Sequence, residues 1–292
     1  MVSALPLEDR DGVIWLDGEF VPWRDAKIHI LAHSLHYGSA VFEGERVYRG
    51  KVFKLHEHSA RLRQSSELLG YTLPYSVEQI EQASSEVVRR NNVETGYVRP
   101  IAWRGSEVIG VSAKGSKAHV AIAAFPWGAY YGDEARKHGI KLMTSSWRRP
   151  APTSAPTASK AAGLYMICTM SRDAAEAAGY QDALMLDYRG QVAEATGANL
   201  FLVMDGKLHT PTPDCFLDGI TRRTVMDLAR QRNIEIIERA IFPEELHRAQ
   251  EVFLTGTAVE VIPVGVIDQL KFTVGPITQQ LQADYQALTQ SF

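Results

Sequence analysis

The stretch "DALMLDYRGQVAEATGANLFLVMDGKLHTP", residues 182–211, has the pattern of a run of short strands. Apolar and β-branched residues fill its segments, and the pairs Arg189-Gly190 and Asp205-Gly206 are typical of tight turns between strands. No helical pattern separates these segments, as it would in doubly wound βαβ units. The stretch therefore predicts a barrel-like sheet.

The remainder of the second half adds a few helices to this sheet. We expect a strand over 140–147, a helix over roughly 161–178, an amphipathic helix over 219–233, two strands about a tight turn over 251–264, and a terminal helix over 276–288. Many strands and few helices favour a barrel-like sheet in this half.

The first half is predicted to be α+β. Asp17-Gly18 and Arg49-Gly50 each lie between two short strand patterns and indicate hairpins. A helix is expected from about residue 56 to 69. A second helix, from 76 to about 91, begins with a capping box formed by Ser76 and Gln79.

The domain boundary is placed by a change of pattern. Segments 96–105 and 117–127 are rich in β-branched and aromatic residues and are predicted strands. The segment "GAYYGDEARKHG", 128–139, then interrupts the pattern. We therefore expect a domain over residues 1–127, an interdomain loop over 128–139 and a second domain over 140–292.

Composition excludes several classes of protein. The chain has 292 residues, 45% of them hydrophobic and 22% charged, and a net charge of −3 gives no signal for nucleic-acid binding. The two cysteines, Cys168 and Cys215, suggest neither a disulfide framework nor a zinc site. "MVSALPLEDRDG" at the N-terminus lacks the pattern of a signal peptide, and no apolar run approaches a membrane span. We expect a soluble cytoplasmic protein.

Histidines gather in "KIHILAHSLHYG" and just after it, at His29, His33, His36, His56 and His58. Spacing of i, i+4 on a helix is ligand spacing for a metal ion. However, this segment alternates as well as it repeats helically, and no carboxylate or cysteine joins it locally. We expect packed or hydrogen-bonded histidines and no metal.

Lys160, in "TSAPTASKAAGLYM", is the only Lys, Arg, Asp or Glu between Arg149 and Arg172. A lysine with a buried stem and a solvated head is the ordinary interpretation. The alternative is a nucleophilic amine, because a lysine away from water and carboxylates is easier to deprotonate. Such lysines most commonly form Schiff bases with pyridoxal phosphate, which also requires an anion site and a carboxylate beside the pyridine nitrogen.

Candidates for both partners are present. Glu194 is an acid within an otherwise uncharged strand-and-turn segment. Arg61 lies on a predicted amphipathic helix, where a solvated face is the simpler interpretation. "TGTA", 255–258, offers backbone N–H groups and hydroxyls that could surround a phosphate or carboxylate. Each signal is weak alone, but together they supply every group that the cofactor needs.

Eight motifs, in this order along nearly the whole chain, resemble those of the class IV aminotransferases and are most similar to the branched-chain amino acid aminotransferases: "HYGSAVFEGERVY", "HSARLRQS", "YVRP", "AFPWGAY", "PTASKAAGLY", "EATGANLF", "LDGITRRTV" and "FLTGTAVEVIPV". The resemblance implies fold type IV of the pyridoxal-phosphate enzymes, as in D-amino acid aminotransferase. This α+β fold has a small α/β domain and a larger pseudo-barrel domain. It also implies a homodimer or a higher homo-oligomer with pyridoxal 5'-phosphate in the cleft between the domains.

The resemblance also assigns roles to residues. Lys160 would be the Schiff-base lysine and Glu194 would keep the pyridine nitrogen protonated. The phosphate would be bound by Arg61, the backbone at Ile220 and Thr221, and Thr257, while Tyr165 would hydrogen-bond the cofactor's phenolic oxygen. Substrate residues would be Tyr37, Phe42, Trp127 and Tyr130 around the side chain, Tyr97 and Arg99 at the distal carboxylate of glutamate, and Thr257 and Ala258 at the α-carboxylate. Tyr37 would reach in from the neighbouring subunit.

The implied reaction is transamination between L-leucine, L-isoleucine or L-valine and 2-oxoglutarate, giving branched-chain 2-oxo acids and L-glutamate in amino-acid biosynthesis or breakdown. An apolar aromatic pocket with one arginine could accept both an aliphatic side chain and a carboxylate. Lys160 would then carry the proton between the substrate Cα and the cofactor.

Two residues depart from the family pattern. Glu45 stands where an aliphatic residue is usual, and we expect its side chain to point outward because residues alternate along a strand. Ala198 stands where glutamate is common, so the support of the loop around Glu194 is expected to differ.

Other functions stay open at this stage. Relatives on the same fold are D-amino acid aminotransferase, R-selective amine transaminase and aminodeoxychorismate lyase, and "YGSAVFEGER" and "YVRP" favour none of them. A non-catalytic relative that binds pyridoxal phosphate is a different class of function. A sugar- or peptide-binding sandwich would leave the isolated Lys160 unexplained.

Overall fold

The computed structural model describes residues 6–292, and the chain divides into two compact units. Unit 1 comprises the described residues up to Gly128 together with Ser159–Gly163, and unit 2 comprises Ala129–Ala158 and Leu164–Phe292. The first residues of the N-terminal stretch that was assessed for a signal peptide lie outside the described part. Among the helices of residues 6–292, none combines the length and apolarity needed to span a membrane.

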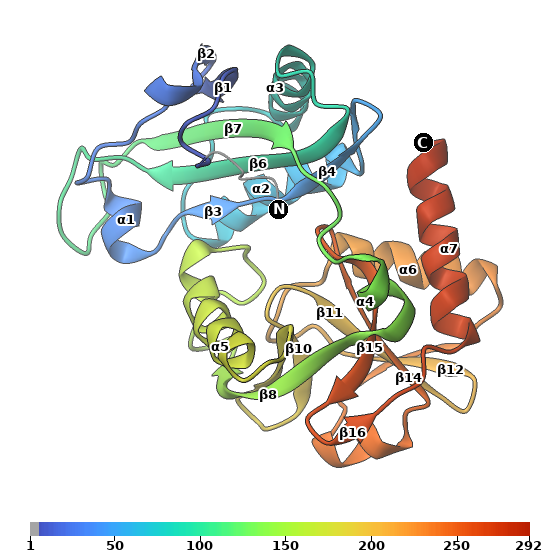
Figure 1. Cartoon of the computed structure of the whole chain (residues 1–292). Helices are drawn as coiled ribbons and strands as arrows, with labels where there is room; N and C mark the ends of the chain where they lie inside the picture. Colours follow the sequence, from blue (N-terminus) through green and yellow to red (C-terminus); the bar gives the residue numbers. More distant parts are fainter. Residues whose placement is uncertain (1–5) are drawn as a thin grey trace. The chain divides into compact units, whose positions relative to one another are not determined.

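Unit 1 is built on a seven-stranded antiparallel sheet with the order β2-β1-β7-β6-β4-β5, and β3 pairs with β6 (Figure 1). Its strands are β1 (Val13–Leu16), β2 (Glu19–Pro22), β3 (Val41–Phe42), β4 (Glu45–Tyr48), β5 (Lys51–Val52), β6 (Thr95–Arg104) and β7 (Ala118–Pro126). Its helices are α1 (His33–Tyr37), α2 (Leu55–Leu68) and α3 (Val77–Arg90), with a 3-10 turn, η1 (Trp23–Asp25).

Local signals place these elements correctly. The β1–β2 and β4–β5 hairpins turn at Asp17-Gly18 and Arg49-Gly50, as predicted, and all four turn residues have positive φ. Ser76 and Gln79 form the predicted reciprocal capping box at the start of α3. The apolar faces of α2 and α3 pack with the sheet into one core, which includes Leu62, Ile80, Val87, Val98 and Ile122.

Unit 2 is built on a nine-stranded sheet with the order β10-β9-β8-β15-β14-β11-β12-β13, and β16 pairs with β15. Its strands are β8 (Ile140–Arg149), β9 (Asp182–Asp187), β10 (Val192–Ala195), β11 (Asn199–Met204), β12 (Lys207–Pro211), β13 (Ile236–Arg239), β14 (Glu251–Gly256), β15 (Glu260–Ile267) and β16 (Leu270–Lys271). Because β10 also pairs with β11, the strands from β10 through β9, β8, β15, β14 and β11 close into a ring. This ring is the predicted barrel, and it encloses a core that includes Leu184, Leu200, Leu202 and Leu254.

The helices of unit 2 are α4 (Asp133–His138), α5 (Met166–Ala177), α6 (Ile220–Gln231) and α7 (Pro276–Ser291), with the 3-10 segment η3 (Pro243–Arg248). Another 3-10 segment, η2 (Ala162–Tyr165), leads into α5, so the regular helix begins later than the predicted residue 161.

The segment 128–139, expected as a loop, contains α4, which an ion pair of 2.9 Å between Arg136 and Glu260 ties to β15. Ser159–Gly163, placed by sequence in the second domain, belongs to unit 1, since Ala161 forms an isolated bridge with Val41.

Candidate active site

The backbone of Lys160 is fixed between β3 and α2 in unit 1. The Phe42 amide donates to the Lys160 carbonyl over 3.2 Å, and the Lys160 amide donates to the Ser65 hydroxyl over 3.0 Å. The Ser159 hydroxyl donates to the Ser65 carbonyl over 2.9 Å. Lys160 Nζ lies 5.1 Å from the centre of the Phe42 ring. Two secondary-structure elements therefore hold the predicted nucleophile in place.

Arg61, the predicted phosphate ligand, lies on α2 one turn before Ser65. Its Nε and Nη2 donate to the two carboxylate oxygens of Glu43 over 2.6 and 2.8 Å. Burial alone would raise the pKa of Glu43, but the Arg61 charge and the hydrogen bonds from Arg61 and His58 hold it well below its usual range. Glu43 is thus an ionised anchor that fixes the Arg61 guanidinium.

His58 completes this cluster from the same helix. Its Nδ1 lies 2.7 Å from Glu43 Oε2, and both side chains are buried. Burial lowers the pKa of His58 in spite of the neighbouring carboxylate. Since the carboxylate can only accept, the neutral imidazole donates its Nδ1 proton to Glu43.

Glu45 contradicts the expectation of an outward side chain, because it is fully buried. Glu45 and Val47 lie on the same face of β4, and Val47 packs in the core of unit 1. Neither carboxyl oxygen of Glu45 has a hydrogen-bond partner among the described residues. Burial and the Glu43 charge raise the pKa of Glu45 well above its usual value, which favours the uncharged acid.

Four predicted substrate residues form one aromatic group in unit 1. The Arg99 guanidinium lies 4.9 Å from the centre of the Phe42 ring and 5.2 Å from that of the Tyr97 ring. The Tyr97 ring meets the Trp127 ring edge-on at 4.5 Å. Gly44 makes room for this group, since a Cβ atom there would lie 1.9 Å from the Tyr97 hydroxyl.

Two further predicted substrate residues have other surroundings. Tyr37 lies at the end of α1, where its ring is 4.5 Å from that of His33 and 43% of the residue is exposed. Tyr130 belongs to unit 2, where its hydroxyl accepts a hydrogen bond of 2.7 Å from Arg172 Nη1.

Glu194, the predicted partner of the pyridine nitrogen, is buried in β10 within the ring of strands of unit 2. Asn199 Nδ2 donates to its Oε2 over 3.2 Å, and Arg149 Nε lies 3.4 Å from its Oε1. Arg149 ends β8 and donates from Nη1 to Cys168 Sγ over 3.2 Å. An arginine and an amide, both buried, therefore set the orientation of this acid.

The predicted phosphate ligands Ile220 and Thr221 begin α6 directly after Gly219, and no side chain caps this helix. The amides of its first turn thus have no side-chain acceptor there. Gly219 packs against Asn199, since a Cβ atom on it would lie 2.2 Å from Asn199 Oδ1. The start of α6 is therefore placed next to the strand that follows Glu194.

Thr257 and Ala258 lie in the turn between β14 and β15. A Cβ atom on Gly256 would lie 3.3 Å from the Gly197 carbonyl, so this turn contacts the turn that follows Glu194. Thr255 Oγ1, at the end of β14, is buried and has no hydrogen-bond partner within residues 6–292. Three of the predicted cofactor segments thus adjoin in unit 2.

Ala198 ends the turn that follows Glu194, and Tyr165 directly precedes α5. The turn after Glu194 is closed by the Ala195 amide, which donates to the Ala198 carbonyl over 2.8 Å, and the Ala198 side chain packs into the core. Tyr165 caps the N-terminus of α5, and its carbonyl accepts from the Thr169 hydroxyl over 3.2 Å.

Sequence reasoning missed Glu43, Arg149 and Asn199, whereas His58 was expected to be packed or hydrogen-bonded, as it is. Glu43 carries the signal that pointed to Glu194, namely an acid within an apolar strand pattern. Arg149 and Asn199 carry no such signal, because they become neighbours of Glu194 only through the pairing of strands and the folding of the ring.

The histidines that were weighed as metal ligands make hydrogen bonds instead. His33 Nε2 lies 3.0 Å from the Gly110 carbonyl, His36 Nε2 lies 2.9 Å from the Ile30 carbonyl, and His56 Nδ1 lies 2.7 Å from Glu81.

Three neighbouring residues of unit 2 are of types that can bind a metal ion: Asp187, Asp214 and Cys215. The Arg189 guanidinium pairs with both carboxylates, at 2.6 and 2.9 Å. An arginine therefore supplies the positive charge there.

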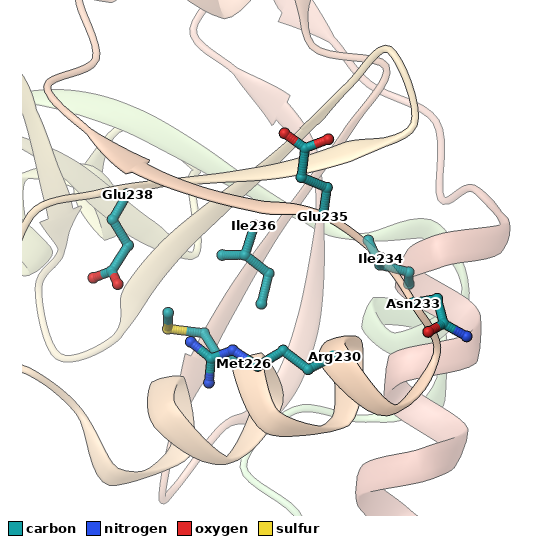
Figure 2. Close-up of a pocket in the computed structure, with 7 residues that line it drawn as sticks. All are labelled: Met226, Arg230, Asn233, Ile234, Glu235, Ile236 and Glu238. Atoms are coloured by element: carbon teal, nitrogen blue, oxygen red, sulfur yellow. The ribbon is translucent and has the colours of Figure 1, made fainter.

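A cavity of about 400 Å³ in unit 2 contains none of the predicted site residues. Figure 2 shows its lining, which comes from α6, from β13 and from the segment between them. Its three charged residues are already paired, Arg230 with Asp227, Glu235 with Lys207 and Glu238 with the buried Arg222. This cavity is therefore separate from the candidate site.

Comparisons with known proteins show the family of this chain. The family described as "Amino-transferase class IV" matches residues 40–267. The branched-chain-amino-acid aminotransferase of Pseudomonas aeruginosa is 43% identical over 288 residues, which cover 96% of this chain and 94% of that protein.

Two solved structures are similar over nearly their whole length. The crystal structure of the Escherichia coli branched-chain amino acid aminotransferase has a TM-score of 0.92 at 40% identity and covers 96% of this chain and 95% of that one. The branched-chain amino acid aminotransferase of Thermobaculum terrenum, in its PLP form, has a TM-score of 0.87 at 31% identity, with 95% and 93% covered. The α+β fold of type IV is thereby confirmed, and the chain belongs to the class IV aminotransferases.

Proposed function

We propose that the protein is a branched-chain-amino-acid transaminase that uses pyridoxal 5'-phosphate. The observation that carries the proposal is the arrangement at Lys160. Its backbone is held by β3 and α2, its amine lies 5.1 Å from the centre of the Phe42 ring, and Glu43, the residue after Phe42, pairs with Arg61. The named relatives support the reaction and its substrates.

The residues of both units fit this cofactor. Unit 1 offers an amine at Lys160 and a fixed guanidinium at Arg61. Unit 2 offers a buried acid at Glu194, a helix start at Ile220 where Gly219 gives no side-chain cap, and a buried hydroxyl at Thr255 that has no hydrogen-bond partner within residues 6–292. An amine, an acid and a set of anion-binding groups are the donors that this cofactor requires. We propose that the two units correspond to the small and large domains of the family and act on the same cofactor.

The roles follow from the chemistry of each group. When bound, pyridoxal phosphate supplies an aldehyde that takes up an amino group and a ring that accepts electrons from the substrate Cα. Lys160 would hold the cofactor through its Nζ, and once the amino group of the substrate had displaced Nζ, the freed amine would move the proton at Cα. Glu194 holds a proton at the pyridine nitrogen, and Tyr165 orients the phenolic oxygen. Arg61, the amides of Ile220 and Thr221, and Thr257 bind the phosphate.

Substrate selection is assigned to the aromatic group of unit 1 together with residues of unit 2. Phe42, Tyr97 and Trp127 present apolar surface to a branched side chain. Arg99 binds the distal carboxylate of glutamate and 2-oxoglutarate, since a guanidinium matches a carboxylate with two donors. Tyr130 lines the side-chain pocket, and Thr257 and Ala258 donate to the α-carboxylate.

A homodimer is proposed from an exposed apolar patch on unit 1. The His33 amide and ring contact the carbonyls of Gly105 and Gly110, so α1 lies against the loop that follows β6. This patch exposes large apolar side chains from both segments: Ile30, Leu31, Leu35, Tyr37, Ile109 and Val111. Contiguous apolar surface of this kind marks an interface. Tyr37 is then placed to enter the site of the neighbouring subunit.

The test of the function is amino transfer by purified protein. Protein supplied with pyridoxal phosphate, L-leucine and 2-oxoglutarate should form the branched-chain 2-oxo acid and L-glutamate in equal amounts. Lys160→Ala should abolish turnover and the borohydride fixation of cofactor to the chain. Turnover with D-alanine alone, or turnover by Lys160→Ala, would overturn the proposal. Localisation in the cytoplasm stays a prediction of the sequence.

A further inference from the structure

Arg172, near the middle of α5, connects three groups of unit 2. Its Nη1 donates to the Tyr130 hydroxyl over 2.7 Å and lies 3.5 Å from Asp182 Oδ2. Its Nε donates to Glu176, one turn later on α5, over 2.7 Å. The guanidinium carbon lies 5.3 Å from the centre of the Tyr130 ring. The tyrosine is therefore held both through its hydroxyl and through its ring face.

Asp182 connects this contact to the strand of Glu194. It is the first residue of β9, it is buried, and its Oδ1 accepts from the Thr196 hydroxyl over 2.5 Å and from the Ala183 amide over 2.7 Å. Thr196 lies in the turn that follows Glu194 and Ala195. One continuous set of polar contacts thus runs from Tyr130 through Arg172 and Asp182 to this turn.

Tyr130 itself lies in an exposed segment, where its ring also meets the Tyr131 ring edge-on at 4.9 Å. Gly128, Ala129 and Tyr130 are exposed and precede α4, and a Cβ atom on Gly128 or Gly132 would meet nothing within 4 Å. A side chain on such a segment samples several positions unless a specific contact holds it. Arg172 supplies that contact from a helix of unit 2.

We propose that Arg172 is a positioning residue that fixes Tyr130 as a wall of the substrate pocket and joins it to the turn beside Glu194. This inference rests on the proposed function for the role of Tyr130. A fixed wall lowers the cost of ordering the pocket when a substrate binds. Loss of Arg172 therefore weakens substrate binding while the chemical step, which Lys160 performs, continues.

The experiment compares Arg172→Met, Tyr130→Phe and the double variant in the holoenzyme. Tyr130→Phe removes the hydroxyl and leaves the Arg172–Asp182 pair, so it tests the contact without exposing a buried charge. Each single variant should raise KM for L-leucine by about tenfold at nearly unchanged kcat, as expected for a lost hydrogen bond to a charged group. The double variant should add little to the KM of Arg172→Met, because that variant has already lost the contact with the Tyr130 hydroxyl. Arg230→Met, which breaks an exposed ion pair on α6, is the matched control and should leave KM unchanged.

Hydrogen exchange gives a readout that does not depend on activity. Peptides covering residues 128–132 should take up deuterium faster in Arg172→Met and Tyr130→Phe than in the wild type and in Arg230→Met. Unchanged exchange together with unchanged KM would overturn the inference, and so would an additive double variant. If the two variants exchange faster than the wild type but the wild type does not transaminate L-leucine, the proposed function is refuted and the contact between Arg172 and Tyr130 still holds.

Discussion

Glu43 and Glu45 lie two residues apart and are both 0% exposed. The Glu43 carboxylate accepts hydrogen bonds from His58 and Arg61, whereas the Glu45 carboxyl group has no hydrogen-bond partner within residues 6–292. Burial penalises the ionised form of both groups. For Glu43 the Arg61 charge outweighs that penalty and lowers the pKa, whereas for Glu45 the Glu43 charge adds to it and raises the pKa well above its usual value. The two acids therefore give opposite pH dependences to the stability of unit 1.

Glu45→Met should stabilise the protein. The wild type buries a carboxyl group without partners, which costs about 1–3 kcal/mol in free energy of unfolding, and methionine fills similar space without polar atoms. A raised folded-state pKa contributes stability below the unfolded-state pKa that is lost as pH rises toward the folded-state value. The gain from Glu45→Met should hence be larger at pH 8 than at pH 5, as measured by urea unfolding.

Glu45→Gln serves as the control for this prediction. It keeps a buried, unpartnered polar group and removes only the ionisation. Its stability should depend less on pH than that of the wild type, without the full gain seen in Glu45→Met. Equal stability of all three proteins at both pH values would show that Glu45 is solvated or paired.

Glu43→Gln should destabilise the protein by about 3 kcal/mol, because it leaves Arg61 without its buried counter-charge. A lowered folded-state pKa contributes stability above the unfolded-state value that is lost as pH falls. The difference in free energy of unfolding between the wild type and Glu43→Gln should therefore shrink below about pH 4.5, the usual pKa of this group.

The apoprotein of Glu43→Gln should also bind pyridoxal phosphate more weakly than the wild-type apoprotein, since the Arg61 guanidinium loses its orientation. Unchanged affinity for pyridoxal phosphate in a folded Glu43→Gln protein would show that Glu43 does not support phosphate binding by Arg61.

Glu194→Gln should slow turnover by roughly two orders of magnitude. An amide cannot hold the positive charge at the pyridine nitrogen, so removal of the Cα proton becomes the slow step. Cofactor affinity should change far less, because the phosphate ligands are elsewhere. Replacing the substrate Cα hydrogen by deuterium should reveal this in rapid-mixing experiments as a larger isotope effect than in the wild type.

Arg99→Ala should impair the reactions of L-glutamate and 2-oxoglutarate more than that of L-leucine. Loss of the guanidinium should lower kcat/KM for L-glutamate and 2-oxoglutarate by roughly 30-fold or more, while L-leucine changes by only a few-fold. Steady-state kinetics of the two half-reactions measure this difference. Equal losses for leucine and glutamate would mean that Arg99 serves the aromatic group through its contact with Phe42 and does not bind the distal carboxylate.

Local sequence signals predicted much of the fold, because they act over a few residues. Asp17-Gly18, Arg49-Gly50 and the Ser76–Gln79 capping box determine hairpins and a helix start without help from the rest of the chain. Many strands and few helices predicted a barrel-like sheet in the second half. Which strands pair to close it, such as β8 with β15, depends on residues far apart in the chain, and no local pattern reports that pairing. For the same reason the return of 159–163 to unit 1 escaped prediction.

The candidate site was predicted from two kinds of signal. Lys160 and Glu194 stand out as isolated charges in apolar sequence, and the resemblance to a family supplied the other residues. Arg172 and Asp182 were missed because each resembles an ordinary surface charge until α5 and β9 bring them together. The orientation of Glu45 was wrong because alternation identifies two faces of a strand, and here both faces are covered by protein.

The visible absorption spectrum of the purified protein tests the central claim most directly. Bound pyridoxal phosphate should give a yellow band that fades when L-leucine is added and returns with 2-oxoglutarate, while D-alanine should leave it unchanged. Bleaching by D-alanine alone would contradict the assigned substrates. A protein that stays colourless after the addition of pyridoxal phosphate would contradict the assignment of Lys160 and the proposed function with it.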